Sequence, residues 1–264
     1  MTPVTLITGA SRGIGRALAF EFAAVGHDLL LVARDGAALK SLSAELAERH
    51  GPGRTFVVAE IDLLSADLLD QLKRELAEQQ LTIDTLVNNA GRVTETPLAR
   101  SDAQDVARLV RLNVEVPTLL VQAFLPSMIA RGTGHILNVA STAGLTPVAN
   151  LGAYSASKSY MISLSTALRR QVRGTGINVS VLIPGPVETD MAKTSALQAN
   201  AWFNFLPWLD AGDVARLAVD GLRANRAVIV PGASNGVAVA ASWVLPSALL
   251  ERLVNFQLAR RRPL

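Results

Sequence analysis

Residues 4–15 read Val-Thr-Leu-Ile-Thr-Gly-Ala-Ser-Arg-Gly-Ile-Gly, and residues 16–24 continue as Arg-Ala-Leu-Ala-Phe-Glu-Phe-Ala-Ala. The apolar and β-branched start predicts a buried strand, and the second stretch predicts a helix. The glycines between them predict a turn whose backbone can approach a phosphate at the helix N-terminus. This order favours a nucleotide site, although the glycine spacing differs from Gly-x-Gly-x-x-Gly. The alternative is a tight turn in any α/β protein.

Strands and helices alternate along the rest of the chain, which predicts a doubly wound parallel sheet of about seven strands. The expected strands cover residues 4–8, 28–33, 54–60, 85–88, 134–139, 178–183 and 227–230. The longest expected helices cover residues 103–131 and 154–174. We find no linker, repeat or low-complexity tract, so residues 1–264 are interpreted as one Rossmann-like α/β domain with a short C-terminal helical extension. In such a sheet, ligands bind outside the carboxyl ends of the strands.

Composition excludes several classes of site. The chain has no cysteine, and its three histidines have no metal-ligand neighbours at useful spacing, so we expect neither disulfides nor a metal. The formal net charge is only +3 and there is no long basic stripe, which argues against a nucleic-acid partner. The first strand begins at Val4, which leaves no room for a signal peptide and favours a cytoplasmic location.

The C-terminal segment, residues 236–264, is the one stretch that could indicate a membrane. Its apolar part, residues 237–250, is too short to cross a hydrocarbon core of about 30 Å. The basic run Arg260-Arg-Arg262 could favour an anionic surface. The preferred interpretation is an apolar helix packed on the domain or on a second subunit.

Tyr154 and Lys158 are four residues apart in an expected helix, so their side chains share one face. A cation beside a phenol favours the phenolate and lowers its pKa from about 10. That predicts a group able to give or take a proton near neutral pH. Ser141, at the end of an expected strand, is the polar residue that accompanies them.

Six motifs occur in family order, and together they resemble the short-chain dehydrogenases/reductases. The resemblance extends from the glycine turn to about Pro231. It includes the following segments: Thr8–Gly15, Asn88-Asn-Ala-Gly91, Asn113, Ser141, the Tyr154/Lys158 pair and Pro184-Gly-Pro-Val-Glu-Thr189. The family implies a hydride exchange with a nicotinamide cofactor, in which the protein supplies geometry and protons.

The resemblance assigns a role to each of four residues. Tyr154 would be the acid in ketone reduction and the base in alcohol oxidation. Ser141 would hold the substrate oxygen near Tyr154. Lys158 would lower the pKa of the tyrosine and bind the nicotinamide ribose, and Asn113 would hold a water that links Lys158 to solvent.

The same resemblance predicts the cofactor-binding segments. The first strand's turn would contact the pyrophosphate, and Asp62 and Leu63 would line the adenine pocket, although Asp62 could equally cap a helix beginning near Ser65. The further expected cofactor-binding residues are Gly9, Ser11, Arg12, Gly13, Ile14 and Gly15, then Asn89, Ala90 and Gly91, then Tyr154 and Lys158. The last are Pro184, Gly185, Val187 and Thr189, which resemble the loop that contacts the nicotinamide.

The end of the second strand favours NADP(H) as the cofactor, with NAD(H) as the alternative. An acidic residue there would bind the ribose 2′-hydroxyl and repel a 2′-phosphate, but the position falls on Ala33, followed by Arg34. Arg12 lies in the glycine turn, and two guanidiniums can clamp a phosphate. Asp35 complicates this prediction, because a shift of one residue would let it face the ribose.

Residues 190–212 are interpreted as a substrate lid. Four aromatic residues, Trp202, Phe203, Phe205 and Trp208, lie within seven positions of a chain that is only 5% aromatic. If they line the pocket, the substrate is bulky and apolar; the alternative is that they pack the lid or a subunit contact. The expected substrate residues are Val93, Leu145, Leu151, Met191, Trp202 and Phe205.

These features predict an NADP(H)-dependent reductase that interconverts a bulky apolar ketone and its secondary alcohol. The alternatives are a 3-oxoacyl-thioester reductase, a non-catalytic nucleotide-binding regulator and a protein docked on a membrane surface through residues 237–262. Family resemblance also implies a homodimer or homotetramer, formed through the two long helices.

Overall fold

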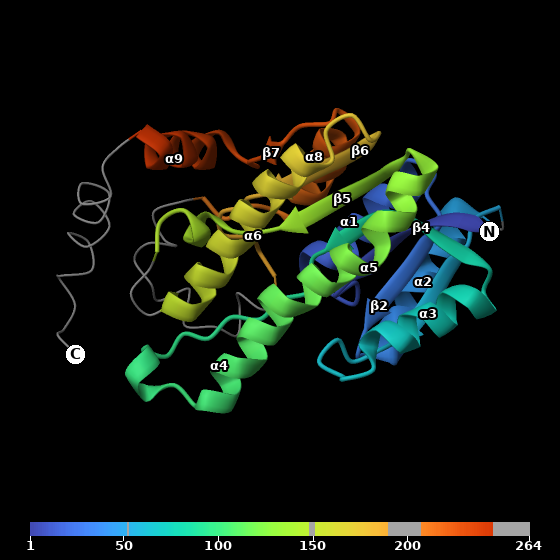
Figure 1. Ribbon diagram of the computed structural model, residues 1–264, viewed down its shortest axis with the longest axis horizontal. Helices are drawn as coiled ribbons and strands as arrows, with labels where there is room; N and C mark the ends of the chain where they lie inside the picture. The colour runs from blue at the N-terminus through green and yellow to red at the C-terminus, as the bar shows by residue number, and fades with distance from the viewer. Residues whose placement is uncertain (52, 148–150, 190–206, 245–264) are drawn as a thin grey trace.

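The computed structural model describes residues 1–51, 53–147, 151–189 and 207–244. Its centre is a parallel sheet with the strand order β3-β2-β1-β4-β5-β6-β7, and helices flank the sheet on both faces (Figure 1). The strands are β1 (Thr2–Thr8), β2 (Leu29–Ala33), β3 (Phe56–Glu60), β4 (Leu81–Asn88), β5 (Gly134–Val139), β6 (Ile177–Leu182) and β7 (Val228–Ile229). The predicted doubly wound sheet of seven strands is confirmed.

Helices cover both faces of the sheet. The α-helices are α1 (Gly13–Ala24), α2 (Gly36–His50), α3 (Leu68–Glu78), α4 (Ala103–Val110), α5 (Val116–Arg131), α6 (Gly152–Gln171), α8 (Ala211–Arg223) and α9 (Ala233–Val244). Helices α1, α2 and α8 pack in one core cluster, whereas α3, α5 and α6 pack in the other. Short 3₁₀ turns occupy Leu98–Arg100 and Thr142–Gly144.

Strand β2 is apolar at every position because helices cover both of its faces. All five residues of β2 are buried, and they alternate between the two cores. Leu29 and Leu31 enter the core with α1, whereas Leu30 and Val32 enter the core with α3. A buried parallel strand therefore reads as a continuous hydrophobic run, which is why these strands were predictable.

The strand order reverses at β1, which lies between β2 and β4. The chain leaves β1 into the glycine turn and leaves β4 into the Asn89–Gly91 segment. Such a reversal opens a crevice beyond the carboxyl ends of the two strands, where ligands bind in doubly wound folds. The predicted motifs of both segments therefore meet at one place.

The long helix predicted over residues 103–131 is interrupted. A π-helical turn at Arg111–Glu115 separates α4 from α5. The whole run is long and apolar enough to span a membrane by length and composition. Its apolar side chains on α5, including Val116, Leu120 and Phe124, instead pack in the core against the sheet.

Candidate active site

The glycine turn forms a tight backbone cradle after β1. Gly9 and Gly13 have positive φ angles of 66° and 55°, a conformation that favours glycine. A Cβ at Gly15 would collide with the Gly9 carbonyl oxygen and the Asn89 amide. Asn89 Nδ2 donates to the carbonyl oxygens of Thr8 and Gly9, at 2.9 and 3.2 Å, and so ties the turn to the end of β4.

This cradle fits a nucleotide pyrophosphate. No side chain of residues 9, 13 or 15 stands between the backbone and a ligand, and α1 begins at Gly13 with its free N–H groups. Thr189, expected at the nicotinamide, lies on the other side of the turn: a Cβ at Gly13 would be 3.1 Å from its Cγ2. The two predicted cofactor segments therefore lie together.

Ser141, Tyr154 and Lys158 converge at the end of β5 and the first turns of α6. Tyr154 is hydrogen-bonded to Ser141. Lys158 lies one helical turn further on, with Nζ 5.7 Å from the centre of the tyrosine ring. It is buried, and its ammonium donates to the Val139 carbonyl oxygen at 2.9 Å. The i, i+4 spacing of Tyr154 and Lys158 puts both side chains on one face of α6, as predicted.

Asn113 lies in the π-helical turn and is buried. Its Nδ2 donates to the Arg92 carbonyl oxygen at 2.9 Å and to Ser157 Oγ at 3.0 Å, and its Oδ1 accepts from the Arg92 N–H at 2.9 Å. A Cβ at Gly91 would stand 3.3 Å from Asn113 Oδ1 and 3.5 Å from Lys158 Nζ. The absent side chain of Gly91 thus leaves both polar atoms facing one small space.

The pKa values of the pair differ from the expected ones. Burial lowers the pKa of Lys158 to about 8, from an ordinary value of 10.5. Burial also raises the pKa of Tyr154, and the hydrogen bond from Ser141 lowers it only in part. The expected lowering of the tyrosine pKa by the neighbouring lysine is therefore wrong for this arrangement, because desolvation disfavours both charged forms.

Arg12 in the glycine turn and Arg34 directly after β2 are both exposed. Asp35 is the N-cap of α2, and its Oδ1 accepts from the Ala38 N–H at 3.0 Å. This bond engages the carboxylate in capping, which weakens the case for a ribose contact. Glu60, at the end of β3, packs its carboxylate against Gly36. The sequence did not predict this carboxylate near Arg34, because its place depends on the pairing of Ala33 in β2 with Glu60 in β3.

Asp62 does not cap the following helix. Its Oδ1 accepts from the Leu64 N–H at 3.0 Å, whereas α3 begins at Leu68 with Asp67 as its N-cap. The alternative interpretation of Asp62 is therefore wrong. Leu63 is buried, and it also lines a cavity of about 260 Å³ between α3 and α5.

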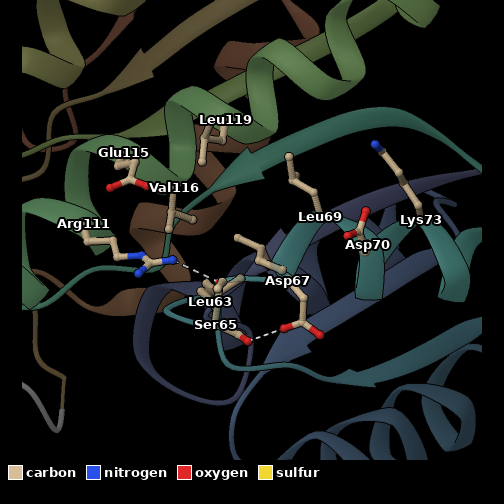
Figure 2. A pocket seen from close by; sticks show the side chains of 12 residues that line it. Leu63, Ser65, Asp67, Leu69, Asp70, Lys73, Arg111, Glu115, Val116 and Leu119 are labelled. Carbon is tan, nitrogen blue, oxygen red and sulfur yellow. Dashed lines mark hydrogen bonds between the residues drawn. The ribbon is translucent and has the colours of Figure 1, made fainter.

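Figure 2 shows this cavity, with side chains of both signs around it. Arg111 reaches across from the π-helical turn and donates to the Ser65 carbonyl oxygen at 3.2 Å. None of the four predicted catalytic residues lines the cavity. The cavity is therefore a neighbour of the predicted adenine segment and not the reaction site.

Part of the predicted substrate wall lies beside Tyr154. Leu151 is buried in a cluster with Val93, Tyr154 and Trp208. Leu145 instead packs in a cluster with Val239 of α9, away from that wall. The predicted residues Met191, Trp202 and Phe205, and most of the expected lid, lie outside the described residues. Trp208 joins this wall, although the sequence did not predict it as a substrate residue.

Comparison with known proteins agrees with this geometry. A family model described as short chain dehydrogenase matches residues 3–200. The chain belongs to the short-chain dehydrogenase family. A 3-oxoacyl-[acyl-carrier-protein] reductase from Synechocystis sp. is 31% identical over 216 residues, which are 81% of this chain and 85% of that protein.

Two solved structures extend the likeness to the whole chain. A short-chain dehydrogenase from Sphingobium yanoikuyae in complex with NADPH is 29% identical, with a TM-score of 0.80 and coverage of 98% of this chain and 96% of that one. A bulky-bulky ketone specific alcohol dehydrogenase from Comamonas testosteroni is 29% identical, with a TM-score of 0.76 and coverage of 99% and 95%. This short-chain dehydrogenase is an oxidoreductase, and its glycine cradle fits a nicotinamide dinucleotide.

Proposed function

We propose that this short-chain dehydrogenase interconverts a bulky apolar ketone and its secondary alcohol with NADP(H), using Tyr154 as acid and base. The observation that carries the proposal is the apolar wall of Leu151, Val93 and Trp208 beside Tyr154. Apolar walls around a few polar groups suit a large, weakly polar carbonyl compound. The substrate class named for the alcohol dehydrogenase of Comamonas testosteroni supports the same conclusion.

The chain's own residues supply positioning and protons. A nicotinamide dinucleotide held by the glycine turn would supply a hydride to the carbonyl carbon. Tyr154 gives its phenolic proton to the carbonyl oxygen, so that one hydride and one proton convert the ketone to the alcohol. Ser141, bonded to Tyr154, holds the same oxygen. A raised tyrosine pKa keeps the phenol protonated at neutral pH, which suits the acid role in reduction.

The proton lost by Tyr154 must be replaced from solvent. Lys158 Nζ and Asn113 Oδ1 face the space over Gly91, which supports a water-linked path between them. The pKa of about 8 for Lys158 lets its ammonium release and regain a proton near neutral pH. Asn113 is rigid in this position, since three hydrogen bonds hold its amide.

Preference for NADP(H) is part of the proposal. Arg12 and Arg34 are exposed and available to a 2′-phosphate, while Asp35 caps α2. Replacing both arginines with glutamine is expected to weaken NADPH binding at least tenfold more than NADH binding, measured by fluorescence titration. Equal losses for the two nucleotides would contradict the assignment.

A 3-oxoacyl-thioester reductase is the second candidate. The relative from Synechocystis favours it, and so does an arginine pair that the sequence reasoning did not find. Arg92, which precedes Val93, and Arg108 both bind Asp105 Oδ1, at 3.1 and 3.0 Å. The two guanidiniums and the one carboxylate leave a single positive charge, which suits an anionic carrier.

The two candidates are separated by comparing kcat/KM for bulky aryl ketones and for a 3-oxoacyl thioester, both with NADPH. The proposal predicts a higher value for the ketones. A higher value for the thioester, lost in Arg92→Gln, would move the function to acyl-chain metabolism.

We also propose a homodimer or homotetramer built through α5 and α6. Leu119 on α5 and Tyr160 on α6 are exposed, at 37% each, so both helices present apolar side chains that a second copy could cover. Sedimentation velocity would report the oligomeric state, and a monomer at micromolar concentration would contradict the proposal.

A further inference from the structure

Asn235 lies in the first turn of α9 and is fully buried, with 0% of its surface exposed. Its Nδ2 donates to the Pro231 carbonyl oxygen at 2.9 Å. Its Oδ1 has no hydrogen-bond partner among the described residues. Buried polar atoms are usually paired, so an asparagine retained here points to a role beyond filling space.

The polar end of this amide faces Gly185. A Cβ at Gly185 would lie 2.5 Å from Asn235 Oδ1, 2.6 Å from Nδ2 and 2.7 Å from Cγ. The amide oxygen and nitrogen, and not the apolar part of the side chain, therefore come closest to the backbone of Gly185. Glycine is required because any side chain at position 185 would displace the asparagine.

The segment around Gly185 is held from two other directions. The Thr142 N–H donates to the Pro184 carbonyl oxygen at 2.9 Å, directly after Ser141 in the chain. Leu209 accepts from the Glu188 N–H at 2.9 Å and donates to the Pro186 carbonyl oxygen at 3.0 Å. Asn235 supplies the third contact, from the C-terminal helix.

Helix α9 is itself anchored beside this segment. Val239 is buried in a cluster with Ile183, Met161 and Val181, at the ends of β6 and in α6. The position of Asn235 over Gly185 is therefore fixed by the same packing that fixes α6, which carries Tyr154.

We propose that Asn235 is a positioning residue that fixes the Gly185 segment in the conformation that receives the nicotinamide end of the cofactor. This inference rests on the proposed function and on the expectation that Pro184, Gly185, Val187 and Thr189 belong to the loop that contacts the nicotinamide. It gives helix α9, which leads into the C-terminal segment, a part in cofactor binding. Asn235 acts through the Gly185 backbone and takes no proton.

The test measures NADPH affinity separately from turnover. Asn235→Ala is expected to raise the Kd and KM for NADPH about tenfold, with a smaller fall in kcat, because the segment loses its restraint before binding. The adjacent and exposed Ser234→Ala is the matched control and should leave all three values unchanged. A purely structural role would lower the melting temperature of Asn235→Ala and leave its NADPH Kd, measured well below melting, unchanged.

Gly185→Ala provides an independent arm that leaves Asn235 in place. Its added Cβ is expected to weaken NADPH binding at least tenfold by displacing the amide, and Asn235→Ala in the same chain should recover part of that loss. Additive effects, or an unchanged NADPH Kd in either single variant, would overturn the inference. If the wild-type protein binds NADPH but turns over no ketone, the proposed function is contradicted. The NADPH Kd values of the variants still decide the role of Asn235.

Discussion

Tyr154 and Lys158 share one face of α6, and burial is the main cause of the pKa shift of each. The i, i+4 spacing was visible in the sequence, as were the residue types of Ser141 and Asn113. The direction of the tyrosine pKa was not, because it depends on how far the fold removes the phenol from water. The pairing of Asn113 with the Arg92 backbone was equally hidden, since it joins residues 21 positions apart through tertiary contact.

The central residue prediction concerns Tyr154→Phe. Loss of the phenolic proton is expected to cut ketone turnover by about 10² or more, while NADPH binding stays nearly unchanged. Tyr160→Phe is the matched control, because Tyr160 is the chain's other tyrosine, also lies on α6, is 37% exposed, and has its hydroxyl 3.0 Å from Thr118 Oγ1. Retained turnover in Tyr154→Phe, measured by NADPH oxidation, would refute the acid role.

Lys158 illustrates a conflict between stability and activity. Lys158 is only 5% exposed, and its ammonium donates to one carbonyl oxygen. Lys158→Met is therefore expected to be inactive yet more stable than wild type at pH 7, by about 1–3 kcal/mol in urea unfolding of the ligand-free protein. The unfolded chain binds more protons than the folded one between pH 8 and 10.5, so wild-type stability rises across that window.

The stability difference between Lys158→Met and wild type should therefore be largest below pH 8 and narrow toward pH 10.5. A variant less stable than wild type at pH 7 would show that the lysine contributes more through its hydrogen bond than it loses by burial.

At the scale of elements, the strands were predictable and the breaks in helices were not. Parallel strands covered on both faces are continuous apolar runs, as in β2, so composition alone marks them. The π-helical turn at Arg111–Glu115 inserts into an apolar helical pattern without a glycine or proline signal of its own. The one sign in the sequence is Pro117, which has no N–H to bond the Asn113 carbonyl four residues earlier. The apolar pattern nevertheless predicted one helix over residues 103–131.

The glycine turn gives a prediction for an element. Gly15→Ala is expected to weaken NADPH binding at least tenfold, since its Cβ collides with the Gly9 carbonyl oxygen and the Asn89 amide and must deform the cradle. Gly53→Ala is the control, because a Cβ there meets nothing within 4 Å. Wild-type NADPH affinity in Gly15→Ala, by fluorescence titration, would show that the cradle does not bind the nucleotide.

At the scale of the whole molecule, acid stability should depend on a histidine that lies outside the active site. His27 follows α1, contacts Thr5 Oγ1 through Nδ1 at 2.8 Å, and packs against the Phe22 ring. Burial lowers its pKa, although the charge of Asp84 raises it in part and nearby His135, Arg223 and Arg54 lower it further. The folded chain therefore binds fewer protons here than the unfolded chain as the pH falls below about 6.5.

Wild-type stability is expected to fall between pH 7 and pH 5 more steeply than that of His27→Gln, in urea unfolding at each pH. The reason is that protonation of His27 favours the unfolded state. His50→Gln is the control and should retain the wild-type slope. Parallel slopes for wild type and His27→Gln would exclude His27 as the group responsible.

The central claim for the whole molecule is Tyr154-dependent reduction of bulky ketones with NADPH. The most direct measurement follows alcohol formation and cofactor oxidation by wild type across small ketones, bulky aryl and steroid ketones and a 3-oxoacyl thioester, with NADPH and NADH in parallel and Tyr154→Phe as the blank. The account predicts the fastest turnover with a bulky ketone and NADPH, and almost none in the blank. Turnover of the thioester alone, or no turnover in a protein that binds NADPH, would contradict it.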